Sequence, residues 1–129
     1  MERYIIVTTF CKDKQTAEAI CDTLLNKNLV AGCQVSKADS KYWYNGSLQM
    51  AHEYRLEFRS VASFYDLIRD EIAEIHNYEI PEISCVEIKD ANDEFIEWIN
   101  QYTVESYEPE DEEDEEDEED EDDKDFGLL

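Results

Sequence analysis

Apolar residues recur along the chain in two kinds of pattern, one typical of strands and one typical of helices. Tyr4–Phe10 is a continuous run of β-branched and aromatic residues, which favours a strand buried on both faces. After Asp13, a suitable helix N-cap, apolar residues follow the spacing of an amphipathic helix. They are Ala17, Ile20, Cys21, Leu24 and Leu25. Asn28 is predicted to end this helix in a left-handed conformation.

Residues 30–59 predict one long antiparallel hairpin that closes at Asn45-Gly46, because this dipeptide favours a type I′ turn. With Tyr44 opposite Ser47, alternation along the strands gathers the apolar side chains on one face. That face carries Cys33, Val35, Trp43, Leu48, Met50, Tyr54, Leu56 and Phe58. The opposite face carries Gln34, Ser36, Glu53, Arg55 and Glu57. A bend or bulge within Ser36–Ser40 would exchange the faces on one side of it. Gly32 indicates a bulge or the close approach of another backbone.

The predicted hairpin is too long for the domain that carries it. A strand over residues 30–44 would span roughly 50 Å, whereas a domain of this size has a radius of gyration near 13 Å, as an order of magnitude. The hairpin should therefore overhang, and its apolar side chains need a covering surface. A second copy of the chain is the expected cover. The predicted oligomer interface consists of Trp43, Tyr44, Leu48 and Met50.

The second half of the body predicts a helix, a strand and a final helix. Ser60 or Ser63 could cap the first helix, whose apolar face would carry Phe64, Leu67, Ile68, Ile72 and Ile75. Pro81 ends helical geometry before a strand over Ile83–Ile88. Asn92 or Asp93 then opens a helix with Phe95, Trp98, Ile99 and Tyr102 on one face. The resulting β-α-β-β-α-β order with a C-terminal helix predicts an α+β, ferredoxin-like fold.

Acidic residues are concentrated near the C-terminal end of the chain. Residues 105–125 hold 17 acidic residues and one lysine, so this stretch accounts for −16 of the formal net charge of −24. We expect residues 1–104 to form one ferredoxin-like domain and residues 105–129 to be a disordered acidic tail. The tail could be a solubilising extension, a docking segment for a basic protein partner, or a loose trap for divalent cations. Nucleic acid is not an expected partner, because phosphate binding requires clustered lysine and arginine.

Neither a membrane span nor a disulfide framework is expected. No apolar run approaches the roughly 18 residues of a spanning helix, and the first residues lead into a strand without a small-residue cleavage site. These features favour a cytoplasmic protein without membrane contact. The four cysteines lack Cys-x-x-Cys spacing and lie inside predicted helices and strands, which argues against a disulfide framework or a zinc finger.

The segment His76–Ile83 places one imidazole, two carboxylates and one phenol on a single connection between a helix and a strand. His76 and a carboxylate of Glu79 or Glu82 could bind a metal, with the Cys33 thiolate if folding brings it close. Alternatively, His76 simply ends the helix. His52 could be a second ligand or a solvated strand residue. Tyr42, Trp43 and Tyr44 near the hairpin turn could stack on a planar ligand or form an oligomer interface.

A catalytic function has little support in the sequence. The chain has three glycines and no glycine-rich phosphate loop, and its spacing suggests neither a Ser-His-Asp nor a Cys-His relay. An enzyme that uses Glu79 or Glu82 as a general base is the weakest of the functions considered. We therefore expect a non-enzymatic protein.

Several motifs together resemble the CutA family of divalent-cation tolerance proteins over about residues 4–102. Residues 28–33 (NLVAGC) resemble the family's K-L-A-A-C segment, and residues 40–46 (SKYWYNG) resemble S-x-Y-x-W-x-G. Residues 76–82 (HNYEIPE) resemble H-P-Y-E-x-P-E, and residues 95–98 (FIEW) resemble Y-L-x-W. The chain departs from the pattern in having Gly32 for alanine, Tyr44 for tryptophan, Arg59 for lysine and Asn77 for proline.

This resemblance implies a ferredoxin-like homotrimer, similar in architecture to the PII signalling proteins, with hairpins packed across subunits and clefts between them. It also implies a link to tolerance of copper or another divalent cation, with no organic cofactor and no catalytic activity. The metal-associated residues carried over are Cys33, His76, Glu79 and Glu82. The residues carried over for the ligand cleft are Tyr42, Glu53, Arg59 and Tyr78. Asn77 in place of proline is expected to loosen the loop that holds His76.

Overall fold

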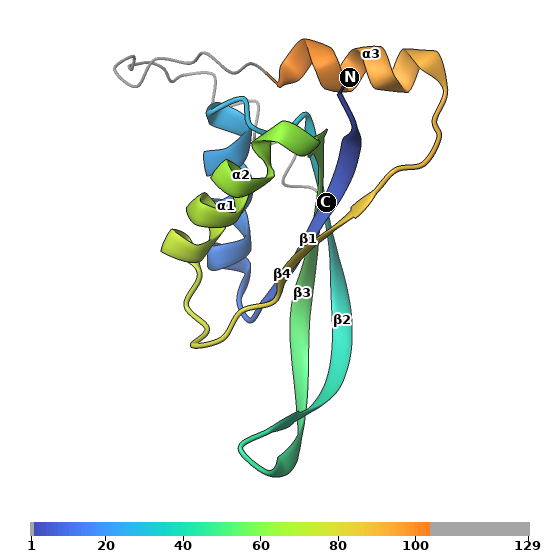
Figure 1. Cartoon of the computed structure of the whole chain (residues 1–129). Helices are drawn as coiled ribbons and strands as arrows, with labels where there is room; N and C mark the ends of the chain where they lie inside the picture. The colour runs from blue at the N-terminus through green and yellow to red at the C-terminus, as the bar shows by residue number, and fades with distance from the viewer. Residues whose placement is uncertain (1, 104–129) are drawn as a thin grey trace.

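Four antiparallel strands form the sheet of this protein, in the order β2-β3-β1-β4 (Figure 1). A computed structural model describes residues 2–103. The strands are β1 (Tyr4–Cys11), β2 (Gly32–Tyr44), β3 (Ser47–Val61) and β4 (Ile83–Glu87). Strand β3 lies between β1 and β2, which is the split β-α-β arrangement of the ferredoxin-like fold, so the predicted fold class is confirmed. The acidic tail and its predicted partner lie outside the described residues.

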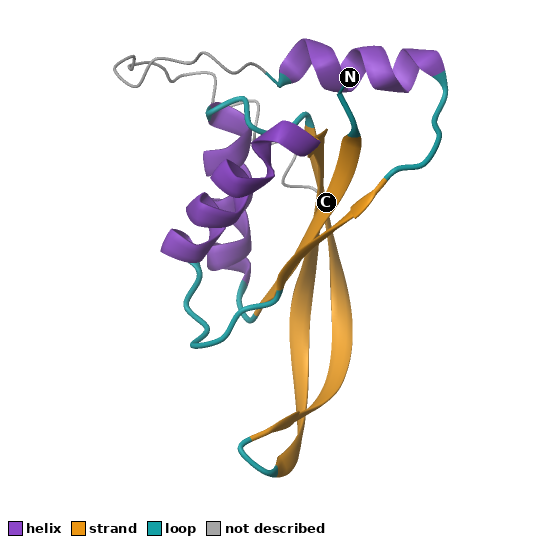
Figure 2. Ribbon diagram, in the orientation of Figure 1, coloured by secondary structure: helices purple, strands orange, loops and turns teal. Residues whose placement is uncertain are grey.

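Two helices cover one face of the sheet, and a third crosses one end of it (Figure 2). Helix α1 (Lys14–Asn26) and helix α2 (Tyr65–Ile75) pack beside each other, and a short 3-10 turn, η1 (Ala62–Phe64), precedes α2. Helix α3 (Asp93–Tyr102) packs against β3. The core between the helices and the sheet contains Val7, Ile20, Leu24, Leu56, Phe58, Ile68, Ile72 and Ile99, all fully buried.

Helix α1 begins and ends beside the residues that the sequence predicts for its two ends. Asp13 caps the helix by accepting a hydrogen bond from the Thr16 backbone N–H at 3.0 Å. Asn28 has a φ of 56°, the left-handed conformation predicted for it. Its backbone turn lets Leu29 donate to the carbonyl of Leu24 at 3.1 Å, which satisfies one of the last carbonyls of the helix.

The predicted cap of the second helix was wrong. Ser60 lies inside β3, where its hydroxyl donates to the Leu29 carbonyl at 2.5 Å, and Ser63 donates instead to Glu2 Oε1 at 3.0 Å. Neither hydroxyl caps a helix, because η1 leads directly into α2 without a side-chain cap. Leu67, predicted on the apolar face, is exposed.

The hairpin has the predicted register over its whole length. Tyr44 lies opposite Ser47, and Asn45 and Gly46 have φ values of 52° and 79°. Pairing between β2 and β3 continues one residue to one residue, without a bulge within Ser36–Ser40, so the two predicted faces hold. Strand β1 stops supporting β3 at the pair Cys11–Tyr54. Beyond it, residues 38–53 form a two-stranded ribbon, about 20 Å long, which projects from the body (Figure 1).

Gly32 lies against an aromatic ring that leaves no room for a side chain at this position. A Cβ atom at this position would lie 2.7 Å from Cη2 of Trp98 on α3, which is closer than two carbon atoms can approach. The prediction that another backbone approaches Gly32 was therefore wrong in its detail, since the neighbour is a side chain. Trp98 also contacts the ring of Phe95, with centroids 5.5 Å apart.

Cys21 on α1 and Cys33 on β2 form a disulfide, with 6.3 Å between their Cα atoms. The expectation drawn from cysteine spacing was thus wrong for this pair. Spacing along the chain does not report that α1 packs on the start of β2, and that contact brings the two sulfurs together. Cys11 is a buried free thiol and Cys85 an exposed one.

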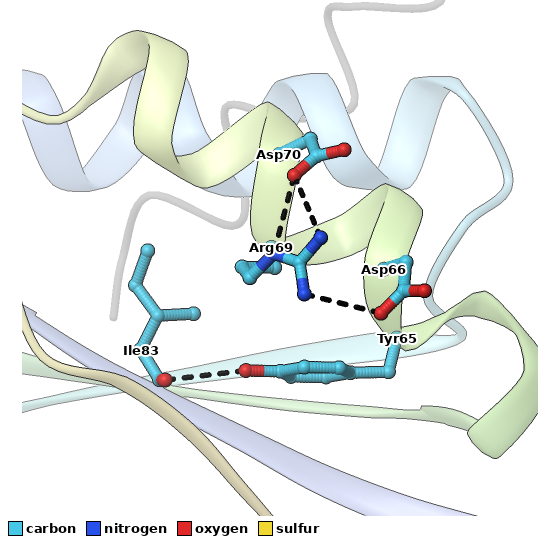
Figure 3. Close-up of polar contacts among 5 residues, drawn as sticks. All are labelled: Tyr65, Asp66, Arg69, Asp70 and Ile83. Carbon is cyan, nitrogen blue, oxygen red and sulfur yellow. Dashed lines mark hydrogen bonds and ion pairs between the residues drawn. The ribbon is translucent and has the colours of Figure 1, made fainter.

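Contacts from the first turns of α2 hold the start of β4 (Figure 3). The Tyr65 hydroxyl donates to the Ile83 carbonyl at 3.2 Å. The Arg69 guanidinium lies 5.7 Å from the centre of the Tyr65 ring and pairs with Asp66 and Asp70, both at 3.1 Å. These contacts fix one end of the connection between α2 and β4, which forms the site described below.

The contact between Gly32 and Trp98 gives a first testable prediction. Gly32→Ala should lower the free energy of unfolding by about 1–3 kcal/mol, because the added methyl group overpacks the site. In a Trp98→Ala background the same substitution should cost less, since the clash is gone. Urea denaturation of the four proteins at one protein concentration measures this. Equal losses in both backgrounds would contradict the assigned clash.

The buried thiol of Cys11 predicts a loss of stability in alkali. Burial, followed by the charges of Asp13 and Glu53, raises its pKa from 9.0 to about 11. The unfolded chain loses this proton at lower pH than the folded chain, so the stabilisation present below pH 9.0 is lost as pH rises through about 11. The slope from this group is at most about 1.4 kcal/mol per pH unit. Cys11→Ala should give a flatter pH profile in urea denaturation; identical profiles would show that Cys11 does not titrate in this range.

Candidate functional site

The loop from His76 to Glu82 is attached at both ends to the end of β1. His76 Nε2 lies 2.7 Å from the Phe10 carbonyl oxygen, and the Thr9 hydroxyl donates to the Glu82 carbonyl at 2.7 Å. Thr9 is fully buried, so its hydroxyl needs this partner. The loop is therefore held against the point where β1 ends and the ribbon begins.

His76 uses both ring nitrogens to hold this loop. Because a carbonyl can only accept, Nε2 carries the proton toward Phe10, and Nδ1 accepts from the Tyr78 backbone N–H at 3.2 Å. Its ring also contacts the Tyr78 ring, with centroids 4.9 Å apart. His76 therefore ends α2 and also holds Tyr78 in position.

Asn77, which stands where the CutA pattern has proline, attaches the loop to α1. Its side-chain amide donates to the Thr16 hydroxyl at 3.3 Å, beside the N-cap of the helix. The amide thus supplies a contact that a proline side chain could not make.

Two tyrosine–glutamate hydrogen bonds connect the loop to the ribbon. The Tyr78 hydroxyl donates to Glu53 Oε2 at 2.7 Å, and the Tyr44 hydroxyl donates to Glu79 Oε1 at 2.6 Å. Burial and the hydrogen bond to Glu53 raise the pKa of Tyr78. The hydrogen bond to Glu79 raises the pKa of Tyr44. Both phenols therefore stay protonated and donate to the carboxylates.

Between the loop and the ribbon lies a cleft of about 530 Å³. Its lining residues are Phe10, Ser40, Lys41, Tyr42, Tyr44, Glu53, Asn77, Tyr78, Glu79, Ile80 and Glu82. They supply four aromatic rings, three carboxylates and one lysine. The volume is typical of a site for a small molecule, and the charge of the lining favours a cation.

The structure brings together most, but not all, of the residues proposed for the site. Tyr42, Glu53, Tyr78, Glu79 and Glu82 line the cleft. Arg59 does not line it, and its guanidinium lies 3.5 Å from Glu57. Cys33 is also absent from the lining, and its sulfur is bonded to Cys21.

Sequence reasoning did not select Phe10, Ser40, Lys41 or Ile80 for the site, although they line the cleft. Ser40 and Lys41 belong to the ribbon. The register places Ser40 on the same face as Tyr42, so alternation from the Asn45-Gly46 turn could have found it. Phe10 carried no such signal, because it lay inside a strand predicted to be buried.

The residues considered for metal binding do not form a ready metal site within one chain. Among residues 2–103, no three histidine, cysteine, aspartate or glutamate side chains gather as a group that could hold a metal ion. Both nitrogens of His76 are engaged, and Glu82 Oε2 accepts from the Ser84 hydroxyl at 3.1 Å.

Three of the four residues predicted for the oligomer interface share one face of the ribbon. Trp43 is 73% exposed, Leu48 59% and Met50 74%, and the register places them together, since Trp43 lies opposite Leu48 and Lys41 opposite Met50. Tyr44 points to the other face, where it contacts Glu79 and lines the cleft. None of the helices between residues 2 and 103 is long and apolar enough to cross a membrane.

This chain has relatives both in sequence and in structure. The divalent-cation tolerance protein CutA of Archaeoglobus fulgidus is 30% identical over 105 residues, which cover 81% of this chain and 100% of that protein. A probable cutA homolog of Encephalitozoon cuniculi is 30% identical over 100 residues, or 78% of this chain and 88% of that protein.

Solved structures of CutA proteins resemble this chain as well. CutA1 from Oryza sativa superimposes with a TM-score of 0.77 at 25% identity, over 81% of this chain and 96% of the other. The Archaeoglobus fulgidus structure gives a TM-score of 0.76 at 25% identity, over 78% and 99%. The latter is described as periplasmic and a rice relative as chloroplastic, so a cytoplasmic location stays a prediction for this chain.

The family model described as CutA1 divalent ion tolerance protein matches residues 5–102, nearly the whole described body. This match and the two relatives at 30% identity confirm the resemblance found in the motifs. The chain belongs to the CutA1 family of divalent ion tolerance proteins.

Proposed function

We propose that this CutA family member acts in divalent-cation tolerance as a non-enzymatic homotrimer that binds a small ligand at clefts between its subunits. The observation that carries the proposal is the ribbon of residues 38–53, which projects beyond β1 with its apolar side chains exposed. The relatives are named as tolerance proteins and not as enzymes.

The exposed face of the ribbon supports self-association. A two-stranded ribbon is marginally stable alone, and burial of each large apolar side chain contributes about 1.5–3 kcal/mol. Trp43, Leu48 and Met50 present such side chains on one face. Each further copy of the chain presents the same ribbon. The resemblance to the family sets the expected number of copies at three.

The position of the cleft supports binding between subunits. One wall is the ribbon face with Tyr42, Tyr44 and Glu53, and the other is the loop with Tyr78 and Glu79. A neighbouring subunit that covers the ribbon would lie beside this cleft and restrict its opening. Ligand binding and assembly would then involve the same segment of the chain.

Binding of copper or another divalent cation by Cys33, His76, Glu79 and Glu82 is a competing proposal. A metal at His76 would have to displace the Tyr78 N–H from Nδ1, and Cys33 would have to leave its disulfide. The family's name favours a role for divalent cations, whereas the contacts within one chain favour the small ligand.

A second function follows from the charge of residues 105–125, a net −16. A trimeric scaffold would present three such tails and gain avidity for a basic protein partner. Deletion of residues 105–129 should abolish capture of the partner and leave the oligomer intact. Unchanged capture would exclude this function.

Assembly through the ribbon is tested with a matched pair of substitutions. Met50→Asp should raise the dissociation constant of the oligomer at least about tenfold, because it places a charge in an apolar interface. Ser47→Asp adds the same charge to the opposite face of the ribbon and should have little effect. Light scattering over a range of micromolar concentrations measures both. A wild-type chain that is monomeric in this range would contradict the trimer.

The role of His76 separates the two ligand proposals. His76→Ala should lower the free energy of unfolding by about 1–3 kcal/mol, since it leaves the Phe10 carbonyl and the Tyr78 N–H without their partner. Its affinity for copper, measured by calorimetry on the full chain, should equal that of wild type and of a control, His52→Ala. Copper binding weakened only by His76→Ala would instead support the metal site.

A further inference from the structure

Glu53 is a buried carboxylate that lacks a cationic partner in the described part of the chain. Its residue is 8% exposed, and it accepts a hydrogen bond from Tyr78 through Oε2. No lysine, arginine or histidine between residues 2 and 103 lies within ion-pair distance of it. A buried charge without a counter-ion costs several kcal/mol, as an order of magnitude. A positive ligand in the cleft would offset that cost.

Glu79 provides a second acceptor on the facing wall. Its Oε1 accepts from the Tyr44 hydroxyl, and no described residue donates to its Oε2. The same holds for Oε1 of Glu53. One carboxylate from the ribbon and one from the loop therefore each keep an oxygen for N–H donors, while the tyrosines hold the other oxygens in place.

Aromatic rings make up much of the remaining wall. Phe10, Tyr42, Tyr44 and Tyr78 line the same cleft as the carboxylates. Aromatic faces attract cations, by about 0.5–1 kcal/mol at exposed sites and about 2 kcal/mol when the cation is desolvated. Rings and carboxylates together suit an organic cation, which has both a charge and an apolar part.

Two alternatives fit the cleft less well. A bare divalent cation needs several converging ligands, and no group of three is present among residues 2–103. An anion would face three carboxylates with Lys41 as the one cation in the lining. The volume of about 530 Å³ also suits a molecule rather than an ion.

We propose that the cleft between the ribbon and the His76–Glu82 loop binds a small primary ammonium ion, with its N–H groups on Glu53 and its carbon chain against the tyrosines. This deepens the proposed function, on which it rests, by naming the class of ligand. Binding would involve no covalent step. The bound amine stays protonated.

The proposal is tested by calorimetry on the full chain with butylammonium as the probe. Glu53→Gln should weaken binding at least tenfold, and Tyr42→Leu several-fold. Glu53→Asp, which keeps the charge, should retain part of the affinity. Glu74→Gln, on α2 outside the cleft lining, should bind as wild type does. All the variants carry the same acidic tail, so binding to the tail cancels in the comparison.

Two further probes test the chemistry. Tetramethylammonium, which has charge but no N–H, should bind more weakly than butylammonium, and neutral 1-pentanol should bind much more weakly than either. Equal binding of pentanol and butylammonium, or an unchanged affinity in Glu53→Gln, would overturn the proposal. So would a divalent cation whose binding depends on Glu53 when that of butylammonium does not.

Light scattering on the same samples distinguishes failure of the ammonium site from failure of the proposed assembly on which it rests. An oligomeric wild-type protein that binds no butylammonium would overturn the ammonium site alone and would indicate that a cation from a neighbouring subunit meets Glu53. A monomeric protein would contradict the proposed assembly. If Glu53→Gln lost both assembly and binding, Tyr42→Leu in an intact oligomer decides, and unchanged binding there would overturn the proposal.

Discussion

The unequal length of neighbouring strands is the constraint on which the rest of this structure depends. Strand β1 ends at Cys11, opposite Tyr54, whereas β2 and β3 continue together to the Asn45-Gly46 turn. A third strand normally supplies the support that two strands lack. Its absence along residues 38–53 leaves apolar side chains exposed on one face and creates an open corner on the other, where the His76–Glu82 loop lies.

The His76–Glu82 loop forms one wall of the cleft because hydrogen bonds attach it to β1 and to the ribbon. Hydrogen bonds from His76 and Thr9 fix the loop to β1 at both ends, and Tyr78 and Tyr44 connect its middle to the ribbon. Each contact joins residues far apart in the sequence. The cleft is therefore a product of the tertiary fold, and no single segment of the chain contains it.

Sequence reasoning succeeded where the deciding interaction is local. The turn residues at Asn45-Gly46 set the hairpin register, and Asp13 and Asn28 set the ends of α1. It failed where a distant partner competes. The Ser60 hydroxyl is taken by the Leu29 carbonyl, and Cys33 is taken by Cys21. For the site, the family resemblance supplied Tyr42, Glu53 and Tyr78, but nothing local could show that Tyr78 would meet Glu53.

The two tyrosine–glutamate hydrogen bonds have a thermodynamic consequence. They join the loop wall of the cleft to the base of the ribbon at Glu53 and to its tip at Tyr44, so any molecule that alters them changes the free energy of the ribbon's orientation. Such coupling is reciprocal: whatever fixes the ribbon must change the affinity of the cleft by the same factor. Occupancy of the cleft and contact along the ribbon are then two readouts of one equilibrium.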